Sequence, residues 1–190
     1  MSNQFAAIAF TDAVREVQRE MGSRAAYADF DSGVARNHRL GENEIAFLQM
    51  RDSFYMASVG ETGWPYVQHR GGPPGFVRVL DDRTIGFADY RGNRQYVSVG
   101  NLRGNDRVSL FFMDYPNQAR LKMLGRARVI GSDHEQMALL QEEHRASAEG
   151  LGGEPELEDD GNTSDCLAGL LVRHASPVVL AHFRGQFHGH

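Results

Sequence analysis

The sequence predicts a mainly β protein with flanking helices, an α+β fold built around an antiparallel barrel or sandwich. Short segments rich in β-branched and aromatic residues follow one another through the middle of the chain. Turn sequences with glycine, proline and acidic residues separate them, as at 61–63, 73–75 and 115–117. Strands so closely spaced favour antiparallel pairing. We predict six of them, at 53–60, 65–71, 76–80, 84–89, 106–114 and 118–131.

Helical periodicity is found on both sides of the strand-rich middle. Near the N-terminus, Thr11 is a suitable N-cap and Gly22 a suitable stop for a helix. Apolar residues recur between them and beside them at helical spacing, namely Phe10, Ala13, Val14, Val17 and Met21. Asn43 is expected to cap a later helix, and the turn Gly92-Asn93 to begin another. The further helices are predicted at 24–31, 43–50, 94–103 and 133–146.

The length of 190 residues predicts a single domain. Its first part, about 1–50, is expected to be a helical extension of the β-rich part. Residues 148–164 are acidic and contain glycine but few large apolar groups, which predicts a surface loop. A final β-like segment follows this loop.

Composition excludes several classes of function. With 41% hydrophobic and 24% charged residues the chain is expected to be globular, and its formal charge of -5 disfavours a nucleic-acid partner. Cys166 is the only cysteine, so an internal disulfide and a multi-cysteine metal cluster are excluded. No apolar run reaches the roughly 20 residues of a membrane span, and no signal peptide is visible. We therefore expect a cytoplasmic protein with no membrane partner.

Three separate segments offer hydrogen-bond donors to an anion. Side chains alternate along a strand, so Arg120, Lys122, Arg126 and Arg128 share one face of the strand at 118–131, while Ala119, Leu121, Met123, Gly125, Ala127 and Val129 share the other. Tyr66, Gln68 and Arg70 share one face of the strand at 65–71. Asn93, Arg94 and Gln95 are expected to open a helix, where unpaired N–H groups attract anions. A solvated strand face and a simple Asn93 cap remain the alternatives.

Three motifs resemble the pyridoxamine 5'-phosphate oxidase-like FMN-binding split-barrel family. They are Gly63-Trp64-Pro65-Tyr66, the run from Phe87 to Gln95, and the run from Arg107 to Phe112 followed by the strand to Ile130 with Gly125. The resemblance covers roughly residues 50–131. It implies a six-stranded antiparallel split barrel that forms a homodimer with FMN bound at the dimer interface.

The resemblance also implies which residues bind the cofactor. Gln68 falls where the family has an arginine that reaches the FMN phosphate, and Arg70 is expected to take over that charge. Asn93, Arg94 and Gln95 fall on the family's Ser-Arg-Lys phosphate cluster, and Arg120 falls on a glutamine that reaches the cofactor across the dimer. Ala88 and Asp89 occupy an aromatic-threonine pair beside the flavin. Gly71 and Gly72 replace branched residues and let the backbone approach the flavin ring.

The same resemblance leaves the substrate open. Pyridoxamine 5'-phosphate oxidases proper use a C-terminal tryptophan and arginine, whereas Trp64 is the only tryptophan here. We therefore expect an FMN-dependent oxidoreductase that moves hydride or electrons between FMN and a small or nicotinamide substrate such as NAD(P)H. No catalytic residue is assigned, because alternation turns His69 away from Gln68 and Arg70, and no metal is expected. The alternatives are a non-catalytic flavin carrier or redox sensor, or a split barrel that binds haem or a deazaflavin.

Overall fold

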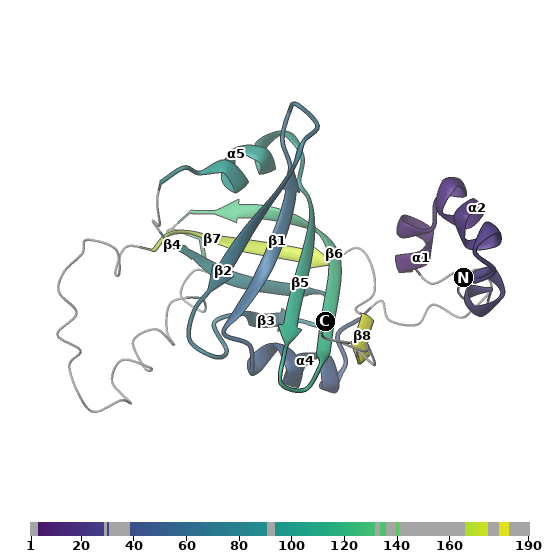
Figure 1. Ribbon diagram of the computed structural model, residues 1–190. Helices are drawn as coiled ribbons and strands as arrows, with labels where there is room; N and C mark the ends of the chain where they lie inside the picture. The colour runs from purple at the N-terminus through teal and green to yellow at the C-terminus, as the bar shows by residue number, and fades with distance from the viewer. Residues whose placement is uncertain are drawn as a thin grey trace, which may run out of the picture.

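The computed structural model describes residues 4–28, 30, 39–90, 94–131, 134–135, 140, 166–174 and 179–182. Within these ranges the strands form one antiparallel sheet that curls into a split barrel (Figure 1). The strands are β1 Ser53–Val59, β2 Pro65–Gly71, β3 Arg78–Asp81, β4 Thr84–Tyr90, β5 Arg107–Asp114, β6 Ala119–Ile130, β7 Cys166–His174 and β8 Val179–His182. The predicted fold class and all six predicted strands are confirmed, with small shifts in their ends.

The order of strands in the sheet is β2-β1-β5-β6-β7-β4-β3, and β8 pairs with the beginning of β6. One long strand, β6, therefore pairs with β5 along one edge, and with both β8 and β7 along the other. The sequence predicted only one β-like segment after the acidic loop. The two strands found there complete the sheet, since β7 connects β6 to β4.

Alternation of side chains along the strands fills the barrel. Phe54 of β1 stands at the centre of an aromatic group, with ring centroids 4.7 Å from Phe112, 5.0 Å from Phe87 and 5.8 Å from Phe76. Edge-to-face and offset rings add to the free energy gained by burying their area. The largest fully buried side chains are Phe54, Phe87, Phe112, Leu48, Met56, Ile85, Leu110, Leu121 and Met123.

The predicted alternation of β6 is confirmed from Ala119 to Ala127 and fails after it. Val129 was expected to face inward, but it is 39% exposed, and Ile130 is buried instead. Arg128 and Val129 are exposed in succession, although the pairing with β7 continues without a shift of register. Ile130 is buried in a separate small cluster with Leu140 and Leu80.

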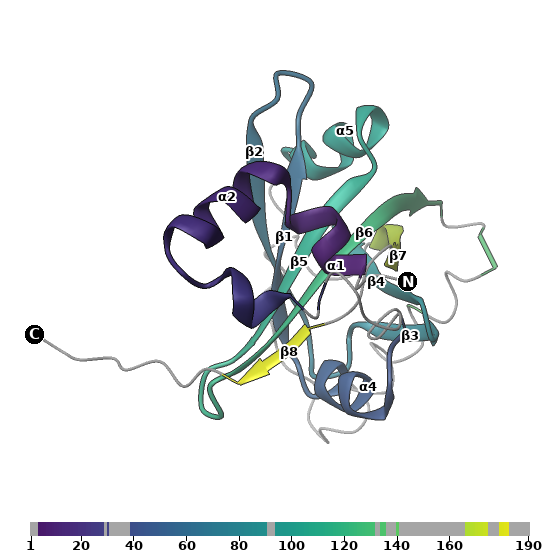
Figure 2. The same ribbon diagram turned by 90° about the vertical axis from the view of Figure 1, so that its right-hand side faces the viewer.

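The helices are α1 Gln4–Ala9, α2 Asp12–Glu20, the 3₁₀ helix η1 Arg24–Tyr27, α4 Glu42–Gln49 and α5 Val97–Gly104. The predicted cap of α2 is confirmed, since Thr11 Oγ1 accepts the Val14 N–H at 3.4 Å. The helix expected at 24–31 is the 3₁₀ helix η1 in its described part. Figure 1 and Figure 2 place α4 and α5 at opposite ends of the barrel, with α1 and α2 outside it. None of the described helices is both long and apolar enough to cross a membrane.

Two predicted helix starts are wrong. Asn43 does not cap α4; the cap is Gly41, whose N–H donates to the Glu44 carboxylate at 3.0 Å. The helix α5 begins at Val97 rather than at 94, because Arg94 and Tyr96 have φ angles of 58° and 51° and cannot continue a right-handed helix. The predicted helix at 133–146 lies outside the described residues apart from 134, 135 and 140, and the acidic loop at 148–164 lies outside them entirely.

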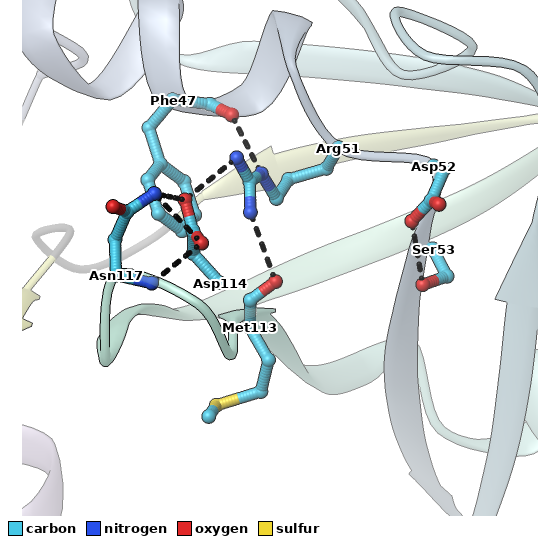
Figure 3. A network of polar contacts seen from close by, with 7 residues as sticks. All are labelled: Phe47, Arg51, Asp52, Ser53, Met113, Asp114 and Asn117. Atoms are coloured by element: carbon cyan, nitrogen blue, oxygen red, sulfur yellow. Dashed lines mark hydrogen bonds and ion pairs between the residues drawn. The ribbon is translucent and has the colours of Figure 1, made fainter.

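A polar network ties the end of α4 to the turn between β5 and β6 (Figure 3). Arg51 donates to the carbonyl oxygens of Phe47 and Met113 and lies 2.8 Å from the Asp114 carboxylate. The side chain of Asn117 donates to the same carboxylate at 3.1 Å. The Asn117 hydrogen bonds and the Arg51 guanidinium hold the pKa of Asp114 below its usual value, against the opposing effect of burial. This network therefore stabilises the fold most in its charged form.

Candidate functional site

The inward face of β2 presents polar side chains to the barrel. Tyr66, Gln68 and Arg70 are half-buried and alternate with the exposed Val67 and His69. The predicted alternation of β2 is thus confirmed. The ring of His69 lies on the outer face, 5.4 Å from the ring of Tyr55. His69 therefore faces away from Gln68 and Arg70, as the sequence predicted.

Arg70 and Asp89 form a buried ion pair between β2 and β4. Their side chains are only 12% and 11% exposed, and the two strands are not neighbours in the sheet. The guanidinium carbon also lies 5.9 Å from the ring centroid of Phe87. Two of the predicted cofactor residues are thus brought together, and they neutralise each other's charge. Arg70 Nε is buried and has no hydrogen-bond partner within the described part of the chain, so one donor of the pair is unused.

Gln68 contacts α5. Ser98, in the first turn of α5, donates its hydroxyl hydrogen to Gln68 Oε1 at 2.7 Å. One turn later the Asn101 amide donates to Ser58 Oγ on β1 at 3.0 Å. Sequence reasoning missed Ser58, Ser98 and Asn101. Their only local signal is the spacing of two polar residues three apart in a helix, which places both on one face.

The turn that leads into α5 is strained. Arg94 and Tyr96 adopt the left-handed conformation without being glycine, which costs about 1–2 kcal/mol at each residue. Tyr96 is left-handed and Val97 begins a right-handed helix, a succession in which neighbouring N–H groups converge on a concavity that suits an anion. Arg94 and Gln95 are exposed. Asn93, which was predicted to act with them, lies outside the described residues.

The two predicted glycines have different surroundings. A Cβ at Gly72 would lie 2.7 Å from Cγ of Phe76, so packing of the Phe76 ring already requires glycine there. A Cβ at Gly71 would meet Cε1 of His69 at 3.3 Å, a tight contact with a side chain that is able to move. Gly72 therefore has a structural explanation that needs no flavin.

Ala88 and Arg120 lie on different parts of the sheet. Ala88 is buried on β4 beside Asp89 and opposite Gly169 of β7. Arg120 is half-buried on β6, between Met113 of β5 and Ala181 of β8, on the opposite face from the core residue Leu121. The structure thus brings β2, β4 and the beginning of α5 together, and it places Arg120 on the outer face of the barrel.

The sequence matches the model of one known protein family. Residues 40–163 match the family model described as pyridoxamine 5'-phosphate oxidase. The chain belongs to this family. The match spans most of the barrel, from α4 through β6, and it includes the residues of β2, β4 and α5 described above. A comparison with curated proteins gives no match.

Several solved structures resemble this chain, and they are distant from it in sequence. The haem storage protein HutZ of Vibrio cholerae is 18% identical, with 73% of this chain and 93% of that chain covered and a TM-score of 0.50. HupZ of Group A Streptococcus is 15% identical, covering 75% and 95% of the two chains with a TM-score of 0.49. An FMN-binding protein related to pyridoxamine 5'-phosphate oxidase, from Nostoc punctiforme PCC 73102, is 16% identical, covering 71% and 77% with a TM-score of 0.44. At 18% identity the likeness to HutZ supports the fold alone.

Proposed function

We propose that this member of the pyridoxamine 5'-phosphate oxidase family is an FMN-dependent oxidoreductase. The observation that carries the proposal is the strained turn at 94–96, which opens α5 beside the inward face of β2. Backbone strain in non-glycine residues persists where the surrounding structure maintains it, and it is concentrated at binding sites. In this family such a position suits the terminal phosphate of a flavin nucleotide.

The phosphate would be bound by backbone and side-chain donors at this end of α5. The N–H groups of Val97 and Ser98 belong to the first turn of the helix, where no carbonyl of the helix accepts them and the helix dipole favours negative charge. Arg94 adds an exposed guanidinium, which donates paired hydrogen bonds to phosphate oxygens. Asn93 and Gln95 remain predicted ligands beside it.

The residues of β2 and β4 fit the ring of the cofactor better than its phosphate. Since Asp89 neutralises Arg70, the pair offers little net charge to a phosphate dianion. The buried and unused Arg70 Nε–H instead fits a neutral acceptor atom such as a ring carbonyl oxygen. Ala88 and Gly71 remain predicted neighbours of the flavin. When bound, FMN would supply hydride or electron transfer, and the chain would position it and exclude water.

We propose in addition that the protein works as a homodimer. The outer face of β1 and β2 exposes Tyr55 by 40% and Val67 by 59%, and it continues toward Arg120 on β6. Apolar side chains gathered on one sheet face are typical of a surface that a partner covers. A second copy bound here would bring Arg120 toward the cofactor of its partner.

The test begins with the absorption spectrum of the purified protein. We expect flavin bands in the visible range, FMN released on denaturation and identified by mass spectrometry, and bleaching when NADH or NADPH is added. A protein that binds FMN but is reduced by neither nicotinamide would support a carrier or sensor instead. A colourless chain whose thermal stability is unaffected by FMN would contradict the proposal.

A further inference from the structure

One face of α5 is attached to the β1–β2 hairpin by two polar bridges. Ser98 is 1% exposed and donates to Gln68 Oε1 at 2.7 Å. Asn101 donates to Ser58, which is also 1% exposed, at 3.0 Å. Residues three apart lie on the same side of a helix, so both bridges act on one face of α5. Buried hydrogen bonds of this kind restrict rotation of the helix about its axis.

The same face of α5 lies close to the β1–β2 hairpin at two further points. A Cβ added at Gly60 would lie 3.1 Å from Asn101 Oδ1, and one added at Gly104 would lie 3.7 Å from Cγ of Glu61. Figure 1 and Figure 2 both show α5 beside the projecting end of the β1–β2 hairpin. The position of α5 along the hairpin is therefore fixed as well as its rotation.

This attachment determines where the beginning of α5 points. Ser98 is the second residue of the helix and follows the left-handed Tyr96 by two residues. The first N–H groups of α5 and the turn at 94–96 thus depend on the bond between Ser98 and Gln68 for their orientation. The resemblance places Gln68 where the family has an arginine that reaches the phosphate. In the structure, Gln68 Oε1 accepts the Ser98 hydroxyl, so this side chain is held against α5.

We infer that Gln68 is a positioning residue: through Ser98 it aims the beginning of α5 at the cofactor's phosphate. Backbone N–H groups and Arg94 then bind the phosphate itself. The neutral side chains of Gln68 and Ser98 thus fix the orientation of α5. The resemblance places a charged ligand at the position of Gln68. This inference rests on the proposed function, because it describes how the same site recognises its anion.

A double-mutant cycle tests the inference. Gln68→Met, Ser98→Ala and the double variant are titrated with FMN and with riboflavin, which lacks the phosphate. We expect each single variant to reduce the preference for FMN over riboflavin about three- to tenfold, as loss of one hydrogen bond implies. The double variant should lose no more than either single variant, because both changes break the same bond. Riboflavin affinity should stay unchanged in all three.

The matched control is Ser53→Ala, since the Ser53 hydroxyl donates only to the exposed Asp52 carboxylate at 3.0 Å. Its flavin preference should equal that of the wild type. A loss of FMN preference in Gln68→Met without any loss in Ser98→Ala would overturn the inference and make Gln68 a direct ligand. Additive losses, or equal losses for riboflavin, would overturn it as well.

Amide hydrogen exchange in the cofactor-free protein separates this inference from the proposed function. The Gly100 N–H donates to the Tyr96 carbonyl at 2.8 Å, which is the first hydrogen bond of α5. Its exchange rate therefore measures the stability of the first turn of this helix. Faster exchange at Gly100 in both single variants, with no further increase in the double variant, would support the positioning role even if the wild type bound neither flavin. Wild-type binding of neither flavin would by itself end the proposed function. Unchanged exchange at Gly100 would overturn the positioning role.

Discussion

Arg94 has both a strained backbone and an exposed charged side chain. We expect Arg94→Ala to weaken FMN binding by about 1.5–3 kcal/mol, the usual contribution of a hydrogen bond to a charged group. Calorimetric titration with FMN measures the loss. Arg103→Ala, at the other end of α5, is the control and should bind FMN like the wild type. Unchanged affinity in Arg94→Ala would remove this residue from the site.

Asp114 is a buried carboxylate whose charge contributes to stability at neutral pH. Its folded pKa is lowered, so its contribution to stability is present above its ordinary pKa and is lost as the pH falls through the lowered value. We expect Asp114→Asn to cost about 3 kcal/mol at neutral pH, because the buried Arg51 loses its ion partner. The difference in free energy of unfolding between the wild type and Asp114→Asn should disappear in acid. Urea unfolding between neutral and acidic pH measures both free energies.

The exposed pair of Arg126 and Asp106 provides the control for this change. These side chains are 63% and 44% exposed, so Asp106→Asn should cost only about 0–1 kcal/mol. If Asp114→Asn retained the acid sensitivity of the wild type, the network in Figure 3 would not be its source.

At the scale of the element, α5 contains a glycine that the fold does not require. A Cβ at Gly100 would have no atom within 4 Å, and its φ is not in the left-handed region. Gly100→Ala should therefore raise the free energy of unfolding by about 0.5–1 kcal/mol, because alanine loses less entropy in a helix. Gly72→Ala is the opposite case, since its Cβ would overlap the Phe76 ring, and it should destabilise by about 1–3 kcal/mol. A destabilised Gly100→Ala would contradict the open space that surrounds Gly100 in the described part of the chain.

The elements differ in how far the sequence predicts them. The six strands β1 to β6 were predictable because alternation and turn residues are local signals. The true beginning of α5 was not predictable, because Arg94 and Tyr96 are residue types that rarely adopt a left-handed conformation. The pairing of β7 with β6 and β4 joins segments far apart in the chain, and no local pattern encodes it.

In the candidate site, too, local patterns predicted some features and missed others. The inward face of β2 follows from alternation, so Gln68 and Arg70 were predicted to share a face. Their partners were not predicted, because Asp89 and Ser98 are brought to them only when the sheet curls. A residue type that suits a ligand also suits a neighbouring side chain, and sequence spacing does not distinguish the two.

At the scale of the whole molecule, the ion pair of Arg70 and Asp89 joins β2 to β4 across the split of the barrel. The sheet path ends at β2 on one side and at β3 on the other, so this contact connects one end strand with β4, the neighbour of the other end strand. A cofactor bound next to this pair would contact both halves of the barrel. Cofactor binding and barrel stability should therefore be linked, since a ligand that binds only the folded state stabilises it.

The proposed homodimer is the assembly on which the outer residues of the proposed site would depend. If Arg120 reaches the cofactor of the partner subunit, Arg120→Glu places a negative charge beside a phosphate or flavin and at the dimer interface. We expect this variant to be more monomeric than the wild type and to lose FMN during gel filtration. Sedimentation analysis, with absorbance recorded in the flavin bands, measures both losses. Arg103→Glu makes the same change of charge at the end of α5 and should keep both the dimer and the cofactor. A monomeric Arg120→Glu protein that still retains FMN would refute a site shared between two subunits, because cofactor binding and assembly would then be independent.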